Sequence, residues 1–355
     1  MKIVTIVGAR PQFIKAAPIS RLLRAEVEEV LVHTGQHYDR EMSAVFFDEL
    51  LIPEPDYNLE VGSGSHGWQT GQMLIRVEEV LLAERPDWVL VYGDTNSTVA
   101  AALAAVKLHI PIAHVEAGLR SYNRQMPEEH NRVLTDHASD LLFCPTETAV
   151  GNLAREGLTQ GVHLVGDVMY DAVLFNAELA QAHASVLERL GLNRGGYALA
   201  TLHRPRNTDD PDRLHSIFTA LSEIKVPVVF PVHPRTRQRL ADAGLESHSA
   251  PSPRLVKPVG YLDMRALEHN AGLILNDAGG VQKEAYFFAV PCITLREETE
   301  WVETVDSGWN LLVGADTTAI VEAASRFKPE GSPPLSFGDG HAAARVVAAL
   351  VGSGA

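Results

Sequence analysis

Cysteine is scarce in this chain of 355 residues, which contains only Cys144 and Cys292. The two lie far apart, and each belongs to an apolar run beside a proline. Two isolated cysteines provide neither a disulfide framework nor a paired metal-binding motif. We therefore expect both thiols to behave as small core residues, in a protein of the reducing cytoplasm.

Long apolar runs are also missing. Spanning a bilayer takes roughly 20 consecutive apolar residues, and no segment of the chain approaches that length. The amino-terminal sequence MKIVTIVGARP has only a five-residue apolar run before Gly8. Such a run is too short for the core of a signal peptide and is typical of a first buried strand. The sequence thus predicts a cytoplasmic protein with no membrane partner.

Basic residues are fewer than acidic ones. Asp and Glu number 45 against 30 Lys and Arg, which gives a net charge of −15 and an isoelectric point of about 5.4. This balance argues against general binding to nucleic acid or to anionic membranes. An anionic substrate would need a local basic pocket within an acidic protein.

Several catalytic and cofactor motifs are absent as well. The chain has no GxGxxG fingerprint, no P-loop, no GxSxG elbow and no HExxH or CxxC. His33 and His37 are four residues apart, but Gly35 between them makes a helix improbable, so a metal pair there is weakly supported. We therefore expect no bound metal and no cofactor.

The chain does contain a regular alternation of strand-like and helix-like segments from end to end. This alternation predicts an α/β protein with parallel sheets, and the length predicts two domains. We place an N-terminal Rossmann-like catalytic domain at residues 1–166 with a returning C-terminal helix at 341–355, and a second Rossmann-like domain at 167–340. Expected helices include 13–25, 170–190 and one beginning at Val281. Two such halves would bind a ligand in the cleft between them.

The segment from Val89 to Arg132 carries the strongest chemical signal. Strands at 88–92 and 110–115 flank an alanine-rich helix and predict a βαβ unit with adjacent parallel strands. Asp94 follows the first strand and Glu116 the second, so both should lie at the carboxyl edge of one sheet. Glu128 follows on a loop. Together these carboxylates suggest proton transfer or cation binding, although each alone is as typical of helix caps and salt bridges.

A glycine turn in the second half is the candidate anion site. Gly279 and Gly280 follow a buried strand and precede a helix, so backbone N–H groups could face a diphosphate. An ordinary tight connection would look the same. Glu284, one turn further on, could accept hydrogen bonds from ribose hydroxyls or be a surface charge.

Basic residues occur at matching strand ends in the two halves. Arg10 and Lys15 follow the first strand, and His203 and Arg204 follow the strand at 198–201. These residues could form the basic pocket that an anionic substrate requires. Taken singly, each is more often a solvated side chain.

Eight ordered motifs identify a family resemblance. They are GARPQFIK, VYGDT, HVEAGLRS, MPEEHNR, TLHRPRN, PVH, DAGGVQKEA and REETEWVET. Over nearly the whole chain the sequence resembles the non-hydrolysing UDP-N-acetylglucosamine 2-epimerases, and GARPQFIK, TGQHYD and TEWVET resemble a branch that includes epimerases of UDP-2,3-diacetamido-2,3-dideoxyglucuronate. The resemblance implies two Rossmann-like domains of the glycosyltransferase-B type, an active site in the interdomain cleft, a UDP-sugar substrate and a homodimer.

The resemblance also implies a mechanism and a set of site residues. The sugar loses its carbon-2 proton and UDP, and UDP then adds back to the 2-acetamidoglucal as the proton returns on the other face. The family's catalytic residues match Asp94, Glu116, Glu128 and His203. Its substrate-binding positions match Arg10, Lys15, His233, Met264, Ala278, Gly279, Gly280 and Glu284.

Three positions depart from the family pattern. Ala278 replaces a serine whose hydroxyl contacts phosphate, Arg206 replaces a glutamate, and Trp301 replaces an arginine outside the branch. A positive charge at Arg206 could alter phosphate affinity or suit a substrate with an extra carboxylate. Some relatives have a second, activating UDP-sugar site near the loop matching Gln36 and His37.

Three function classes remain open at this point. The first is an epimerase of UDP-N-acetylglucosamine and UDP-N-acetylmannosamine, or of the diacetamido glucuronate. The second is a glycosyltransferase of the same architecture, which would need an acceptor. The third is a UDP-sugar-binding protein without turnover.

Overall fold

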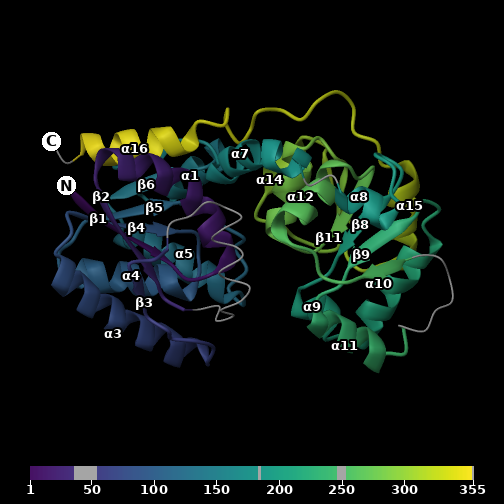
Figure 1. Ribbon diagram of the computed structural model, residues 1–355, viewed down its shortest axis with the longest axis horizontal. Helices are drawn as coiled ribbons and strands as arrows, with labels where there is room; N and C mark the ends of the chain where they lie inside the picture. The colour runs from purple at the N-terminus through teal and green to yellow at the C-terminus, as the bar shows by residue number, and fades with distance from the viewer. Residues whose placement is uncertain (36–53, 183–184, 246–252, 354–355) are drawn as a thin grey trace. The chain divides into compact units, whose positions relative to one another are not determined.

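The protein consists of two compact units. A computed structural model describes residues 1–35, 54–182, 185–245 and 253–353 (Figure 1). The first unit comprises Met1–Phe175 and Leu335–Ala355, and the second comprises Asn176–Pro334. The division falls within helix α7 (Val168–Ala182). Each unit is an α/β structure built on its own sheet.

The described part of the first unit contains a seven-stranded sheet with the strand order β3-β2-β1-β4-β5-β6-β7. Every adjacent pair is parallel. The strands are β1 (Lys2–Val7), β2 (Glu28–His33), β3 (Tyr57–Asn58), β4 (Trp88–Tyr92), β5 (Ile112–Val115), β6 (Leu141–Cys144) and β7 (Val162–Leu164). The predicted adjacency of the two central strands is confirmed, because β4 pairs with β5 from Val89–Ile112 to Tyr92–Val115.

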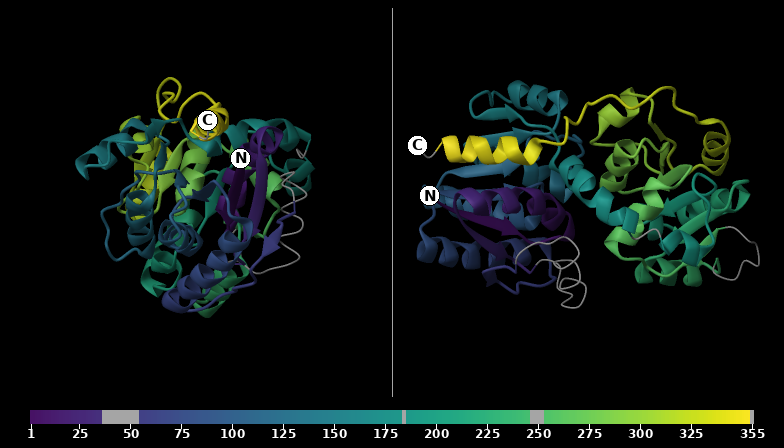
Figure 2. Two further views of the ribbon diagram at one scale, coloured as in Figure 1. Left: turned by 90° about the vertical axis from the view of Figure 1, so that its left-hand side faces the viewer. Right: turned by 45° about the horizontal axis from the view of Figure 1, so that its top comes forward.

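Helices cover both faces of this sheet. They are α1 (Arg10–Glu26), α3 (His66–Glu84), α4 (Asn96–Lys107), α5 (Pro127–Ala138), α6 (Glu147–Arg155) and α16 (Ala342–Gly352). The C-terminal α16 packs beside α1, whereas α3, α4 and α5 pack together on the other face (Figures 1 and 2). The alanines of α4 are almost completely buried, which lets this helix lie close to the sheet.

The described part of the second unit contains a six-stranded parallel sheet with the order β10-β9-β8-β11-β12-β13. The strands are β8 (Ala198–Thr201), β9 (Val228–Pro231), β10 (Arg254–Val256), β11 (Leu273–Asn276), β12 (Cys292–Thr294) and β13 (Asn310–Leu312). The helices are α8 (Ser185–Leu190), α9 (Pro205–Thr208), α10 (Pro211–Glu223), α11 (Pro234–Asp242), α12 (Tyr261–His269), α13 (Gly279–Phe287), α14 (Val302–Asp306) and α15 (Thr317–Arg326).

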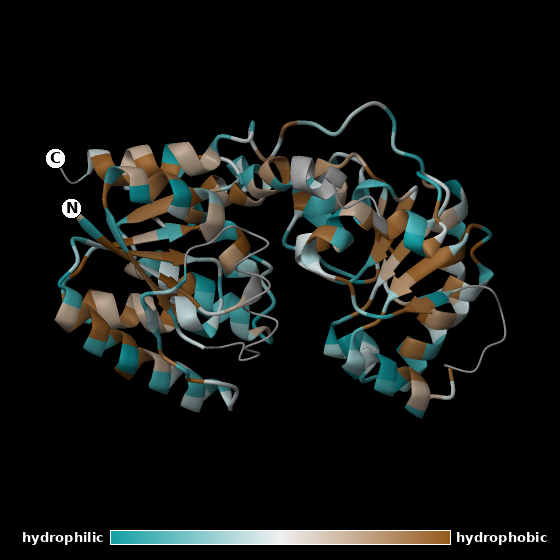
Figure 3. Ribbon diagram, viewed as in Figure 1, coloured by the Kyte–Doolittle hydropathy of each residue, from teal (hydrophilic) through white to brown (hydrophobic). Residues whose placement is uncertain are grey.

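Alternating strand residues build one apolar core on each face of the second sheet. Ala198 and Ala200 pack with α10, α11 and α15, while Leu199 between them packs with α8, α12 and α13. This is the pattern of a parallel sheet buried on both faces. Figure 3 shows the consequence, with apolar strands inside and polar helix surfaces outside. Cys144 and Cys292 are buried free thiols, as predicted.

Some sequence-based boundaries are wrong. Helix α1 begins at Arg10 rather than at residue 13, because Pro11 has the fixed backbone angle that suits a first helical turn. Helix α13 begins at Gly279 rather than Val281, so both glycines belong to its first turn. The expected helix at 170–190 is described as α7 and α8. The sequence analysis also missed α15 and the short elements β13 and α14.

Gly8, directly after β1, lies too close to two side chains to carry a side chain of its own. A Cβ atom on Gly8 would lie 2.1 Å from both Ser97 Oγ and Thr34 Oγ1. These two hydroxyls are hydrogen-bonded to each other at 2.8 Å. A side chain at Gly8 would therefore separate α4 from the sheet edge that carries the candidate carboxylates. Among the described residues, no helix is both long and apolar enough to cross a bilayer.

Candidate functional site

Asp94 lies at the carboxyl edge of the first sheet, one residue after the turn at Gly93. Gly93 has a φ of 60°, a left-handed conformation that favours glycine. The Asp94 side chain is about one-third exposed and forms an ion pair with Arg132 of α5. Asn131 of the same helix donates a hydrogen bond of 3.0 Å to the Asp94 carbonyl. Helix α5 therefore holds Asp94 through both its side chain and its backbone.

Glu116 lies at the same edge, directly after β5. Its carboxylate forms an ion pair with the ammonium of Lys15 in α1. Measured from the position of a Cβ atom on Gly93, the Lys15 Nζ atom is 3.3 Å away and the Glu116 Oε2 atom 3.4 Å away. Both charged groups thus border the turn that carries Asp94. The structure thus places Asp94, Glu116 and Lys15 at one edge of the sheet, as predicted.

Glu128 is in the first turn of α5, two residues after the helix cap Met126. Its side chain is half-buried and, within the described part of the chain, has no hydrogen bond or ion pair. The adjacent Glu129 differs, because its carboxylate accepts hydrogen bonds from the Ser121 and Tyr122 amides at 3.0 and 2.9 Å. Glu129 therefore anchors the preceding loop, and Glu128 is the carboxylate of this pair that remains available for chemistry.

His203 follows β8 in the second unit, and a buried aspartate holds it in place. Asp277 is fully buried and accepts hydrogen bonds from the amides of His203 and Arg204 at 2.9 and 3.0 Å. The His203 ring lies 6.4 Å from the ring of His233, centroid to centroid. His233 caps α11, with Nδ1 accepting from the Arg235 amide at 3.3 Å. The two histidines thus sit together at the carboxyl edge of the second sheet, and both are exposed.

The glycine turn also lies at that edge. Ala278 is the N-cap of α13 and provides no side-chain capping bond. A Cβ atom on Gly279 would lie 2.6 Å from Glu300 Oε1 and 3.2 Å from Trp301 Nε1, so this face of the turn is closely packed. Gly280 is exposed. The first turn of α13 therefore presents backbone donors without a side-chain cap, which suits an anion.

Glu284 is not the surface charge that one interpretation of the sequence allowed, because it is only 3% exposed. It forms an ion pair with Arg265 of α12, which also bonds Glu268 at 2.8 and 3.0 Å. Burial raises the pKa of Glu268 well above its usual value; the charge of Arg265 opposes this rise and that of Glu284 adds to it. Burial alone would lower the pKa of Arg265, but its two carboxylate partners raise it. Arg265 thereby holds Glu284 in one orientation.

Other predicted positions have less distinctive surroundings. Met264 is in the first turn of α12, and its amide donates to the Gly260 carbonyl at 3.0 Å. Arg10 begins α1, but the prediction for its side chain lies outside the described residues, as do those for Gln36 and His37. Arg206 is exposed and pairs with Glu297 at 3.3 Å, so its reversed charge is compensated locally.

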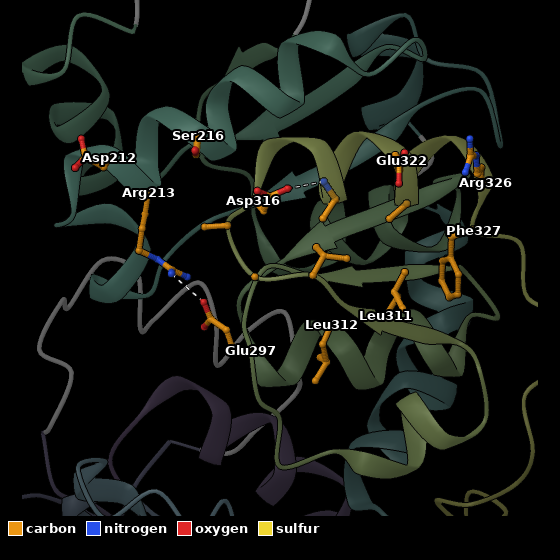
Figure 4. A pocket seen from close by; sticks show the side chains of 15 residues that line it. Asp212, Arg213, Ser216, Glu297, Leu311, Leu312, Asp316, Glu322, Arg326 and Phe327 are labelled. Atoms are coloured by element: carbon orange, nitrogen blue, oxygen red, sulfur yellow. Dashed lines mark hydrogen bonds and ion pairs between the residues drawn. The ribbon is translucent and has the colours of Figure 1, made fainter.

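A cavity of about 960 Å³ in the second unit includes none of the predicted site residues (Figure 4). It lies between α10, α15 and β13, and Glu297 and Arg213 border it with an ion pair of 2.9 Å. Its carboxylates include Asp316, which caps α15, and Glu297, which is paired with Arg213 and Arg206. The candidate chemistry belongs instead to the carboxyl edges of the two sheets.

Several important residues were missed from the sequence alone. Arg132 orients Asp94, Asp277 orients His203 and Arg265 orients Glu284. Arg296 follows β12 and bonds Glu300 at 3.2 Å, while its Nη1 atom is buried without a hydrogen-bond partner among the described residues. Asp277 and Arg296 lie just after strands, a signal that could have revealed them. Arg265 lies within a helix, where nothing local indicates its partners.

Comparisons with known proteins identify the family of the chain. A model of the UDP-N-acetylglucosamine 2-epimerase family matches residues 21–351. A UDP-N-acetylglucosamine 2-epimerase homolog of Methanococcus maripaludis is 56% identical over 99% of both chains. The UDP-2,3-diacetamido-2,3-dideoxy-D-glucuronate 2-epimerase of Pseudomonas aeruginosa is 51% identical over 98% of both chains.

Solved structures show the same architecture. The crystal structure of the Methanocaldococcus jannaschii UDP-GlcNAc 2-epimerase in complex with UDP-GlcNAc and UDP is 45% identical and has a TM-score of 0.91, covering 99% of both chains. The fold is therefore the glycosyltransferase-B type, with two parallel-sheet α/β units. The chain belongs to the UDP-N-acetylglucosamine 2-epimerase family, whose members are isomerases.

Proposed function

We propose that this protein inverts carbon 2 of a UDP-2-acetamido sugar, interconverting UDP-N-acetylglucosamine and UDP-N-acetylmannosamine or a close relative of them. The observation that carries the proposal is the placement of Glu116 and Lys15 against the Gly93 turn that presents Asp94. Inverting a carbon centre requires proton donors or acceptors on both faces of the sugar, and this edge provides more than one carboxylate.

The reaction begins with removal of the carbon-2 proton by a carboxylate. The C–H electron pair forms the double bond between carbons 1 and 2, and the bond from carbon 1 to the diphosphate oxygen breaks, so UDP leaves with that electron pair. The products of this step are 2-acetamidoglucal and UDP. In the return step, UDP adds to carbon 1 and a second acid protonates carbon 2 on the opposite face. We assign these proton transfers to Asp94, Glu116 and Glu128.

The second unit supplies groups suited to UDP. Negative charge develops on the leaving diphosphate, and backbone N–H groups at a helix N-terminus stabilise such charge. We assign the diphosphate to Gly279 and Gly280 together with Arg10 and Lys15, and we assign His203 to catalysis. Glu284 is assigned to the ribose, Met264 to the uracil, and His233 and Ala278 to further substrate contacts. The burial of Glu284 against Arg265 supports its role, since a pre-oriented carboxylate loses little freedom on binding.

The diacetamido glucuronate is the second candidate substrate. It is favoured by the 51% identity to the Pseudomonas aeruginosa enzyme that is named for that sugar, over 98% of both chains. Against it, the extra positive charge at Arg206 is paired with Glu297 and is therefore a weak reason to expect an additional carboxylate on the sugar.

Proton exchange in deuterated water tests the proposal. The enzyme would be incubated with UDP-N-acetylglucosamine, with the UDP-diacetamido glucuronate and with UDP-glucose, and the carbon-2 hydrogen followed by NMR. We expect exchange and a second epimer with at least one acetamido sugar. Asp94→Asn and Glu116→Gln should each lower the exchange rate by roughly 10²–10⁴-fold, as loss of a general acid or base does.

A matched control separates chemistry from a general charge effect. Glu147 is an exposed carboxylate of the same unit, in the first turn of α6, so Glu147→Gln should exchange at the wild-type rate. No exchange with any UDP-sugar would refute the epimerase. Release of UDP that depends on an acceptor, without exchange, would indicate a glycosyltransferase, and tight UDP binding without turnover would indicate a binding protein.

We also propose the homodimer that the family resemblance implies. Light scattering coupled to size-exclusion chromatography would measure it, with an expected mass of twice 38.6 kDa. A mass of one chain at micromolar concentration would contradict this part of the proposal.

A further inference from the structure

His114 is a buried side chain of β5 that the proposed chemistry does not use. It is 0% exposed and lies between two acceptors. Its Nδ1 atom is 2.7 Å from Asp136 Oδ1 in α5, and its Nε2 atom is 2.7 Å from the carbonyl oxygen of Gly93. The imidazole therefore bridges helix α5 to the turn that precedes Asp94.

The partners define the protonation of this ring. A backbone carbonyl can only accept a hydrogen bond, so Nε2 carries a proton. Asp136 also accepts from Arg120 Nη1 at 2.7 Å and from the Gly118 amide at 3.2 Å, as an ionised carboxylate does. Although burial opposes ionisation, the hydrogen bond from His114 and the charge of Arg120 hold the pKa of Asp136 below its usual value. Asp136 therefore fixes the ring orientation that directs Nε2 at the Gly93 carbonyl.

Arg120 and Asp136 fix the end of this hydrogen-bond network that lies away from Gly93. Arg120 is buried, and its Nε and Nη2 atoms each lie 2.7 Å from a carboxylate oxygen of Glu156. Asp136 itself is fully buried. A fully satisfied buried polar network of this kind is rigid, because each member has one arrangement that satisfies all of its partners.

The other end of the hydrogen-bond network is the backbone beside Asp94 and Glu116, the two candidate carboxylates. Gly93 and Glu116 have φ values of 60° and 71°, and such a conformation is strained for glutamate. The Gly93 amide donates to the Val115 carbonyl at 3.0 Å, directly before Glu116. The Gly93 carbonyl that His114 holds directly precedes Asp94. One ring thus constrains the segments that present both groups.

We propose that His114 is a positioning residue: its ring, oriented by Asp136, holds the Gly93 carbonyl and so sets the position of Asp94 relative to Glu116. This inference rests on the proposed function, because it takes Asp94 and Glu116 as the groups that move protons. His114 touches neither substrate nor reacting atoms, and its effect passes through the backbone of Gly93.

Two amide substitutions test the inference as a matched pair. The side-chain nitrogen of His114→Gln can take the place of Nε2 and keep the bond to Gly93. That of His114→Asn can take the place of Nδ1 and keep the bond to Asp136, but it leaves the Gly93 carbonyl without its donor. Both variants keep one buried hydrogen bond, so both should fold. We expect kcat to fall at least tenfold in His114→Asn with KM within about twofold of wild type, and to stay within about threefold in His114→Gln.

The outcomes separate the inference from the function on which it rests. If wild-type enzyme exchanges the carbon-2 hydrogen but the two variants lose kcat equally, or neither loses it, His114 does not position Asp94 through Gly93. If wild-type enzyme shows no exchange with any UDP-sugar, the proposed function fails and the inference fails with it.

The proton on one ring nitrogen provides a readout that needs no activity. Nitrogen-15 NMR of the His114 ring should show Nε2 protonated, as donation to the Gly93 carbonyl requires. In Asp136→Asn the Nε2 proton should remain, because the amide nitrogen can donate to Nδ1 while Nε2 still donates to Gly93. A wild-type ring with an unprotonated Nε2 would overturn the bridging arrangement.

Discussion

Lys15 and Glu116 form a buried ion pair that joins the second turn of α1 to the end of β5. Their side chains are 12% and 5% exposed. The pair brings the GARPQFIK and HVEAGLRS motifs into contact beside Gly93, although about a hundred residues separate them in the chain. The predicted carboxylate edge and Lys15 of the predicted basic pocket thus belong to one structural feature.

Breaking this pair on one side should be more damaging than removing both partners. Lys15→Met leaves a buried carboxylate without its cation and should lower the free energy of unfolding by about 3 kcal/mol. The double variant Lys15→Met/Glu116→Gln should recover at least half of that loss. Urea titration would measure both. Lys107→Met, at an exposed lysine of α4, serves as the control and should change stability by less than about 0.5 kcal/mol. A double variant as unstable as the sum of its single variants would contradict the prediction.

Restoring a hydroxyl at the N-cap of α13 should strengthen both the helix and phosphate binding. Ala278 makes no side-chain capping bond, and a serine there would add about 1 kcal/mol to the free energy of unfolding. If the turn binds diphosphate, Ala278→Ser should also tighten UDP binding by roughly fivefold. Calorimetry with UDP and with uridine would separate the effects, because uridine has no phosphate. An equal gain for both ligands, or no gain, would argue against a diphosphate at this turn.

Glu268 should make the protein less stable as the pH rises. Burial raises the pKa of Glu268 in the folded protein, so the folded state binds this proton more tightly than the unfolded chain, where the pKa is about 4.3. Its favourable contribution is complete below pH 4 and is lost as the pH rises through the folded pKa. Glu268→Gln keeps an acceptor for Arg265 and removes the titration.

The free energy of unfolding of Glu268→Gln should therefore increasingly exceed that of wild type between pH 4 and pH 8, with a difference that reaches about 1–2 kcal/mol. Urea unfolding at several pH values would measure it. A constant difference across that range would show that Glu268 remains ionised throughout. The neighbouring Glu284 pairs with the same guanidinium, so Glu284→Gln provides a comparison at equal burial.

The sequence predicted the repeating part of the fold well, because apolar strands and alanine-rich helices have local patterns. The β4–α4–β5 unit is the clearest example, with Thr95 capping α4 through the Thr98 amide. Short elements without such a pattern were missed, including β13 with the three residues Asn310–Leu312. The predicted helix at 13–25 begins too late, because Pro11 occupies the first turn of α1.

Candidate site residues could be proposed from the sequence because strand ends in a parallel sheet meet at one edge. Asp94, Glu116 and His203 were proposed in that way and by family resemblance. Their supporting residues were not found, since Arg132, Asp277 and Arg265 act through contacts between elements that are distant in the chain. No local pattern encodes such pairings.

The sequence alone determined the class of architecture, because apolar side chains recur with the periods of strands and helices. It also determined which chemical groups follow the strands. Only tertiary structure decided which of those groups are paired. Folding placed Lys15 beside Glu116, Arg265 beside Glu284 and His114 between Asp136 and Gly93. The physical reason is that a buried charge or polar group must find a partner at a distance of about 3 Å, and the packing of whole elements, not the local sequence, supplies that partner.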